Sequence, residues 1–216
     1  MINATPIVYG ARYSVYVQAL QLCLEEKSVA YRLEDVDVFA PGGPPPEHRR
    51  RHPFGRIPAF AHGSLMLYET APICRYVDEA FDGPPLQPVT ATGRARMGQA
   101  IAIGDQYAYA AMVWGLFVET VERPARGEAP DPARVAAAVR TASTCLQALE
   151  ALAPGEPWIA GSTLSLADFH LAPMFALFLK TPAARVLAAE APRLGAWFER
   201  FCARPSAQAI LAPPAS

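Results

Sequence analysis

The sequence predicts an α/β domain followed by an all-helical domain. Three observations support this: strand and helix patterns alternate in the first third, a Gly- and Pro-rich stretch follows at 82–88, and every long segment after it has helical periodicity. The chain has 216 residues, which is enough for two small domains. We therefore expect domains at 1–82 and 90–216, joined by a linker.

The first elements predict a parallel βαβ unit. Residues 7–9 are a short apolar run that ends at Gly10 and reads as a buried strand. Ser14 then precedes a helical pattern in which Val17, Leu20 and Leu24 share one face. Residues 31–38 alternate apolar and polar side chains and predict a second strand, which a right-handed crossover would place parallel to the first.

The rest of the first domain reads as loop, short helix, hairpin and helix. Residues 41–46 contain four prolines and two glycines and must form a loop. A short helix at 47–51 follows, with the arginines at 49–51 on a solvated face. Strands at 59–61 and 65–68 are predicted to pair antiparallel, and 69–81 is predicted to be a helix.

The second domain reads as helices throughout. They are expected at 92–121, 131–152, 165–179, 182–189 and 192–203, and the tail from Pro205 is expected to be loose. Ser165 and Asp168 have the spacing of a capping box, in which each residue satisfies an N-terminal amide near the other. Asp168 therefore reads as a structural residue.

Composition and charge limit the classes of molecule that this protein is expected to bind. Hydrophobic residues make up 52%, charged residues 18%, and the net charge is −1, so nothing indicates a nucleic-acid or membrane partner. No uninterrupted apolar stretch reaches about 18 residues, and the N-terminus has no signal-peptide pattern. The four cysteines are scattered, which argues against a metal site or a disulfide framework and fits a cytoplasmic location.

The segment at 53–60 indicates a ligand-binding turn. A proline at the mouth of a strand, Pro58, cannot donate to the sheet, and the bulky Ile57 before it suggests a cis peptide bond. The backbone N–H and C=O of Ile57 would then face outward and pair with an extended peptide ligand. Taken alone, the segment reads more simply as an ordinary proline turn.

A second segment places opposite charges at a strand-to-helix junction. Thr70 is expected to cap the helix, whose free N–H groups form an anion site, while Glu69 supplies a carboxylate. Together they would hold the ammonium and carboxylate of one α-amino acid head group. The alternative is a capping pair without a ligand.

In order and spacing, these motifs resemble the glutathione transferase superfamily along nearly the whole chain. The stretch at 46–55 and the pattern Tyr9-Gly10-x-x-x-Ser14, followed by Leu24-Glu25-Glu26-Lys27, are similar to the phi and theta classes and their bacterial relatives. The resemblance implies a thioredoxin-like N-terminal domain, an all-α C-terminal helical bundle, and glutathione as co-substrate without a metal. It also implies a homodimer, for which Phe54 is a candidate anchor. The glutathione contacts it implies are Arg56, Ile57, Pro58, Glu69 and Thr70.

The same resemblance makes Ser14 the expected catalytic residue. Serine-type members place a hydroxyl at the start of the first helix, where it hydrogen-bonds to the glutathione sulfur and favours the thiolate. Ser14 can also act as a helix cap, and the two roles are compatible. Three phenols nearby remain alternatives, because tyrosine-type members use one from this region: Tyr9, Tyr13 and Tyr16.

The chain departs from the family pattern around the expected glutathione site. Val15 stands where a proline often follows the serine, Ala19 where an arginine is common, and the loop at 42–45 lacks its usual basic residues. Arg56 replaces a frequent glutamine. We expect Arg56 or Arg12 to take over recognition of the glycine carboxylate of glutathione.

The resemblance implies a transferase that joins glutathione to a hydrophobic electrophile. The acceptor pocket is expected between the domains, with Tyr107 and Trp114 as candidates alongside Tyr109 and Phe117. A glutathione-dependent isomerase, dehalogenase or peroxidase is an alternative on the same site. A binding or scaffold protein without turnover is another, because the basic loop is missing.

Overall fold

The computed structural model describes residues 4–152 and 155–211. The chain divides into two compact units, residues 1–86 and 87–216. The stretch predicted as a linker, 82–88, spans this division.

The first unit is a mixed sheet with three helices. Its elements are β1 (Ile7–Tyr9), α1 (Val15–Glu26), β2 (Arg32–Glu34), α2 (Pro46–Arg51), β3 (Ala59–His62), β4 (Leu65–Tyr68) and α3 (Thr70–Ala80). The sheet order is β2-β1-β3-β4, with β1 parallel to β2 and antiparallel to β3, and β3 antiparallel to β4. The predicted βαβ unit and hairpin are confirmed.

Strand β2 is shorter than the predicted 31–38. The register pairs Tyr9 with Glu34, and β1 ends there, so the residues after Glu34 have no strand to pair with. The carboxylate of Asp37 then accepts a hydrogen bond from the amide of Phe39 at 2.8 Å, which turns the chain. The alternation of apolar and polar residues therefore predicted too long a strand.

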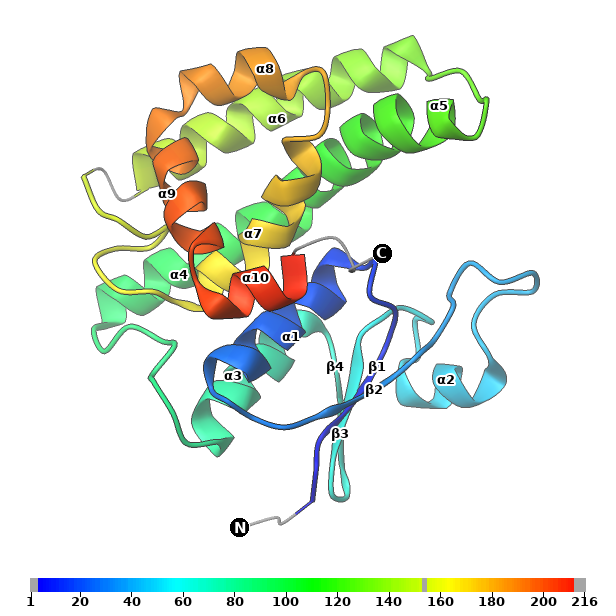
Figure 1. The fold of residues 1–216 in the computed structure, drawn as a ribbon, viewed down its shortest axis with the longest axis vertical. Helices are drawn as coiled ribbons and strands as arrows, with labels where there is room; N and C mark the ends of the chain where they lie inside the picture. The colour runs from blue at the N-terminus through cyan, green and yellow to red at the C-terminus, as the bar shows by residue number, and fades with distance from the viewer. Residues whose placement is uncertain (1–3, 153–154, 212–216) are drawn as a thin grey trace. The chain divides into compact units, whose positions relative to one another are not determined.

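Helices α1 and α3 pack together on one face of the sheet, and α2 lies beyond the other face (Figure 1). The apolar stripe predicted for α1 is fully buried, as are Ile73 and Val77 of α3 and Phe60 of β3. Burial of such a stripe is the main stabilisation of an amphipathic helix in a small domain. This core holds the N-terminal end of α1 in place at the sheet edge.

A buried ion pair ties the end of the first unit to α1. The ammonium of Lys27 donates to the carbonyl of Asp78 at 2.9 Å, to its carboxylate at 3.1 Å, and to the carbonyl of Pro84 at 3.2 Å. The Asp78 carboxylate also accepts from the amide of Leu86 at 2.8 Å. Because both charges are desolvated, several hydrogen bonds are needed to offset their loss of hydration.

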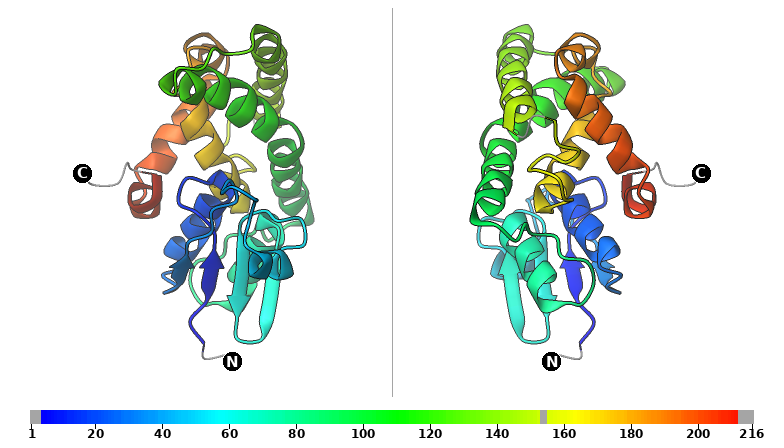
Figure 2. Two further views of the ribbon diagram at one scale, coloured as in Figure 1. Left: turned by 90° about the vertical axis from the view of Figure 1, so that its right-hand side faces the viewer. Right: turned by 90° about the vertical axis from the view of Figure 1, so that its left-hand side faces the viewer.

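The second unit is helical in every described element, and its long helices run side by side (Figure 2). The elements are α4 (Ala91–Ile103), a π-helix (Gly104–Glu122), α5 (Arg123–Ala125), α6 (Pro132–Leu152), α7 (Leu166–Phe178), α8 (Ala184–Leu187), a 3-10 turn (Ala188–Glu190), α9 (Pro192–Cys202) and α10 (Pro205–Leu211). The tail expected to be loose forms α10 up to Leu211, because Pro205 begins a helix whose Ser206 and Ala207 are buried.

The helix predicted at 92–121 is continuous, but it changes geometry along its length. From Gly104 to Glu122 its hydrogen bonds widen to the i→i+5 pattern. Gly115 allows α6 to approach closely, since a Cβ added there would lie 2.4 Å from the Cβ of Ala138. Apolar spacing does not distinguish these two helical forms, so the sequence predicted only the helix.

The run 91–125 is also long and apolar enough, by length and composition alone, to cross a membrane. Asp105 and Glu119 interrupt its apolar sequence, so the sequence alone did not indicate a membrane span here. The run packs along α6 and α7, and the buried Glu119 pairs with Arg134 at 2.9 Å. These contacts pack one side of the run within the second unit.

Asp168 anchors the helical core as the capping box predicts. One of its oxygens accepts from the amide and hydroxyl of Ser165, at 2.7 and 3.0 Å. The other accepts from the amide of Ile159 at 2.9 Å and from the indole N–H of Trp197 at 2.8 Å. Burial raises the pKa of Asp168, and these hydrogen bonds oppose that shift.

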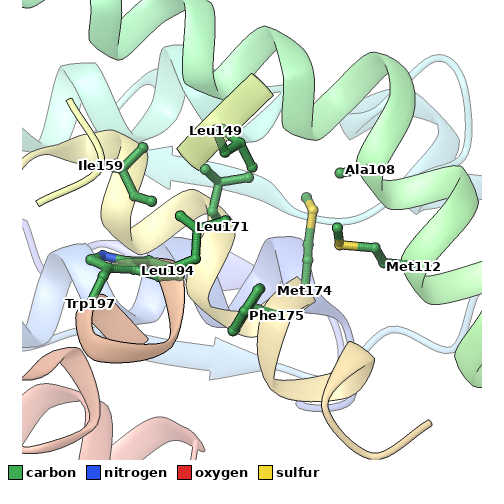
Figure 3. A pocket seen from close by; sticks show the side chains of 9 residues that line it. All are labelled: Ala108, Met112, Leu149, Ile159, Leu171, Met174, Phe175, Leu194 and Trp197. Atoms are coloured by element: carbon green, nitrogen blue, oxygen red, sulfur yellow. The ribbon is translucent and has the colours of Figure 1, made fainter. Parts of the chain in front are cut away.

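A small cavity lies next to this anchor (Figure 3). Its volume is about 10 Å³, and only apolar atoms of its lining are accessible. Figure 3 shows aliphatic, sulfur-bearing and aromatic side chains around it, among them Met112, Leu171 and Trp197. A water molecule needs about 10–15 Å³ and several polar partners, so this is a packing void of the core and not a ligand site.

Candidate functional site

Ser14 caps α1 at the edge of the sheet. Its backbone is extended, and its half-buried Oγ accepts a hydrogen bond from the amide of Val17 at 3.4 Å. A serine hydroxyl that accepts a hydrogen bond from a helix amide keeps its own proton, which it can donate to a second partner. The first turn of α1 contains no acidic residue, so its N-terminal partial positive charge is not offset there.

Gly10 brings the start of α1 next to the proline turn. A Cβ added at Gly10 would lie 2.4 Å from a methyl of Val17 and 3.4 Å from the Cβ of Ile57. Only glycine allows this approach without displacing one of them. Val17, in the first turn of α1, and Ile57, 40 positions later in the sequence, therefore both lie close to Gly10.

The peptide bond between Ile57 and Pro58 is cis, which is the first of the two interpretations that the segment left open. Both side chains are buried. Within the described chain, neither the amide nor the carbonyl of Ile57 makes a backbone or side-chain hydrogen bond. A residue whose backbone N–H and C=O are both unpaired is the feature that an extended peptide ligand requires.

Glu69 adopts a strained backbone conformation at the start of α3. Its φ is +70°, a region that non-glycine residues rarely occupy outside functional or tightly constrained sites. The side chain is exposed. The expected cap at Thr70 is wrong: Glu69 is the N-cap residue without a side-chain cap bond, and Thr70 is the buried first residue of the helix. The φ of Glu69 shifts the helix start by one position.

One arginine lies against the loop that lacks its usual basic residues, and others are exposed elsewhere in the first unit. Arg56 and Arg12 are exposed, as is Arg49, whose guanidinium lies 3.1 Å from where a Cβ on Gly43 would be. The arginine run is solvated at 49 and 50 as predicted, but Arg51 lies over the ring of Tyr9, 4.1 Å from its centroid.

Two histidines of α2 and its C-cap were not identified as functional residues from the sequence. His48 and His52 are 0% and 1% exposed, and neither Nδ1 atom has a hydrogen-bond partner within the described residues. Burial lowers the pKa of His52, while the nearby charge of Glu69 acts in the opposite direction. The only sequence signal for them is the i, i+4 spacing of His48 and His52, which places both on one face of a helix. Because α2 has six residues, its sequence is too short to show a helical periodicity.

Exposed aromatic side chains occur in both units. Tyr13, next to Ser14, is 53% exposed and contacts Phe39 with ring centroids 5.9 Å apart. On the π-helix, the acceptor candidates Tyr107 and Trp114 are 55% and 42% exposed, and the ring of Tyr109 meets Trp114 edge-on at 6.5 Å. Such surfaces suit an apolar, aromatic ligand.

The cysteines do not have the setting of a reactive thiol. Cys23 and Cys74 are buried, and burial raises the pKa of Cys23, Cys145 and Cys202. A nucleophilic cysteine needs a lowered pKa and access to solvent. Within residues 4–152 and 155–211, no group of three or more His, Cys, Asp or Glu side chains is placed to hold a metal ion.

Comparison with known proteins gives a consistent family. The model of the glutathione S-transferase N-terminal domain matches residues 8–85, and that of the C-terminal domain matches residues 99–205. A probable glutathione S-transferase of Oryza sativa subsp. japonica is 30% identical over 97% of this chain and 98% of its own length.

Solved structures agree with the sequence match. The apo form of glutathione S-transferase III superposes with a TM-score of 0.84 at 30% identity, covering 99% of this chain and all of that one. A theta-class glutathione S-transferase of Xanthomonas axonopodis pv. citri with glutathione bound has a TM-score of 0.84 at 27% identity. It covers 98% of this chain and 100% of its own.

Proposed function

This chain belongs to the glutathione S-transferase family, and we propose that it joins the thiolate of glutathione to a hydrophobic electrophile. The observation that supports the proposal is that Gly10 lies against both Ile57, whose backbone is unpaired, and Val17, whose amide donates to Ser14 at the helix start. On this proposal, a hydroxyl donor and a peptide-binding edge share one site. Glutathione supplies a thiol and an extended peptide, which match these two features.

The head group of glutathione would bind at the start of α3. Its ammonium pairs with the exposed carboxylate of Glu69, and its carboxylate receives the N–H groups of the α3 N-terminus and the Thr70 hydroxyl. An eleven-residue helix presents several unsatisfied N–H groups at this end. The cysteinyl part of glutathione then lies along Ile57 and Pro58, as an added strand would.

The second carboxylate of glutathione requires a cation. Arg56 precedes Ile57 directly and is exposed, so it is our first assignment, and Arg12 is the alternative. A guanidinium binds a carboxylate through two parallel N–H bonds, which fix orientation as well as charge. This arrangement replaces the basic residues that the loop at 42–45 lacks.

Ser14 would activate the thiol. A free thiol has a pKa of about 8.5 and is mostly protonated at neutral pH, and each unit of lowering requires about 1.4 kcal/mol. One hydrogen bond to a charged group contributes roughly 1.5–3 kcal/mol, which covers one to two units. The N-terminus of α1 adds to this stabilisation of the thiolate.

Aromatic residues favour a hydrophobic acceptor. Tyr107 and Trp114 are our candidates in the second unit, and Tyr13 with Phe39 adds an exposed aromatic pair directly beside Ser14. A peroxidase that uses a protein thiol is disfavoured, because burial raises the pKa of three of the four cysteines. The bound glutathione thiol remains the nucleophile.

We further propose a cytoplasmic homodimer. Phe54 is 71% exposed and, together with Met66 and Tyr68 at 40% each, forms an apolar surface at the edge strand β4. Monomers rarely leave such a cluster uncovered. The cysteines are all free in the described residues, which fits a reducing compartment.

Retention on immobilised glutathione, followed by an assay with an aryl halide, tests the function. A transferase is retained and forms the thioether conjugate. Retention without conjugate formation for any electrophile tried would favour a binding or scaffold protein on the same fold. A protein that neither binds nor reacts contradicts the proposal.

A further inference from the structure

Helix α2 has one buried side chain, and it is a histidine. His48 is 0% exposed, whereas the other five residues of this six-residue helix are exposed or half-buried. An apolar residue would fill an interior position at lower cost, since a buried polar group must be hydrogen-bonded to offset its desolvation. The contact that His48 makes is therefore informative.

His48 holds the backbone of the proline turn. Its Nε2 lies 2.7 Å from the carbonyl oxygen of Arg56. A carbonyl only accepts, so Nε2 carries the proton and donates it. The tautomer is thereby set, and Nδ1 is a lone pair without a partner among the described residues.

This bond orients the amide that would meet the substrate. The carbonyl of Arg56 and the N–H of Ile57 belong to one planar trans peptide unit, in which they point in opposite directions. When the carbonyl points inward to His48, the N–H of Ile57 points away from it. That amide makes no hydrogen bond within the described chain.

We propose that His48 is a positioning residue for glutathione. It does not contact the tripeptide, but it orients the Ile57 amide toward the cysteinyl carbonyl of glutathione. This inference rests on the proposed function. Without the His48 bond, the Arg56–Ile57 peptide can rotate, and the preorganisation of the binding edge is lost. The same bond keeps Arg56 next to the site.

The test compares His48→Phe with His62→Phe. His62 is also buried in the first unit, and its Nδ1 lies 2.8 Å from the hydroxyl of Tyr76, away from the proline turn. Both variants lose one buried hydrogen bond of similar kind. Calorimetry should show a Kd for glutathione raised about 5- to 10-fold in His48→Phe, the size of one hydrogen bond, and unchanged in His62→Phe.

Kinetics and a conservative variant separate positioning from stability. His48→Phe should raise KM for glutathione with little change in KM for the electrophile, and His48→Gln, which keeps an N–H donor, should recover most of the affinity. Imidazole ¹⁵N–¹H spectra of the wild type should show the Nε2–H tautomer of His48, which keeps the proposal testable if His48→Phe does not fold.

Wild-type binding is measured first. If the wild type does not bind glutathione, the proposed function fails. If it binds and His48→Phe binds equally well, or His62→Phe loses as much affinity, the role of His48 is overturned. An Nδ1–H tautomer in the wild type would overturn it too.

Discussion

The Oγ of Ser14 lies 3.4 Å from the amide nitrogen of Val17 and accepts its N–H at the start of α1. This long cap bond uses a lone pair and leaves the hydroxyl proton for another acceptor. Helix capping and thiol activation are therefore compatible at one residue.

Ser14→Ala should raise the pKa of bound glutathione by about one to two units, because one hydrogen bond to the thiolate is lost. Thiolate absorbance at neutral pH should fall, and the rate should partly recover at high pH. Binding should persist, with stability lowered by about 0.5–1 kcal/mol from the lost cap. Tyr9→Phe, Tyr13→Phe and Tyr16→Phe are the controls, and a pKa shift in one of them but not in Ser14→Ala would reassign the role.

Glutathione should raise the melting temperature of the wild type, because a ligand of the folded state stabilises it by RT ln(1 + [L]/Kd), about 2.7 kcal/mol at 100-fold excess over Kd. Glu69→Ala should abolish this rise by removing the partner of the ammonium. Glu199→Ala, an exposed glutamate on α9, is the matched control and should keep it. A full ligand-induced rise in Glu69→Ala would exclude the assigned contact.

Phe54→Ala should weaken the homodimer. Truncating an aromatic anchor costs about 2 kcal/mol or more, so the dimer Kd should rise about 30-fold or more. Sedimentation velocity at micromolar concentrations measures this. Phe39→Ala removes an aromatic ring of similar exposure, 65% against 71%, and should leave association unchanged. A wild type that sediments as a monomer contradicts the proposed dimer.

Asp168→Asn should lower the free energy of unfolding by about 2–4 kcal/mol. The Asp168 carboxylate accepts four hydrogen bonds in the core, two on each oxygen. The NH2 group of asparagine would replace one of these oxygens and face two N–H or O–H donors that it cannot satisfy. Asp131→Asn is the control, since Asp131 caps the exposed start of α6 and asparagine caps equally well. Urea unfolding compares them, and similar losses in both would refute a special role for Asp168.

Stability should fall as the pH drops below about 6.5, partly through His52. Burial lowers the pKa of His52 in the folded state, so the unfolded state binds more protons between the ordinary value of about 6.5 and the lowered folded value. The stability contributed by neutral His52 is present above that window and lost within it. Unfolding of His52→Asn at pH 7.5 and 5.5 should show a smaller difference than the wild type, and an equal difference would exclude His52 as the cause.

Local signals in the sequence determined much of this protein. Ser14 and the proline turn at 58 each favour one local conformation, and the Ser165–Asp168 spacing specifies a helix start. Hydrophobic periodicity located the longer helices, since 3.6-residue spacing persists over many turns. The family resemblance rested on the order of these same signals.

The tertiary structure alone decided the contacts between distant segments. The length of β2 depends on where β1 ends, and the start of α3 depends on the φ of Glu69, neither of which a single segment encodes. His48 donates to the Arg56 carbonyl only because α2 packs beside the proline turn. A six-residue helix is too short for its sequence periodicity to indicate which face is buried. Contacts of this kind arise when distant segments pack together. Local residue patterns favour the whole fold collectively, but no single pattern specifies one such contact.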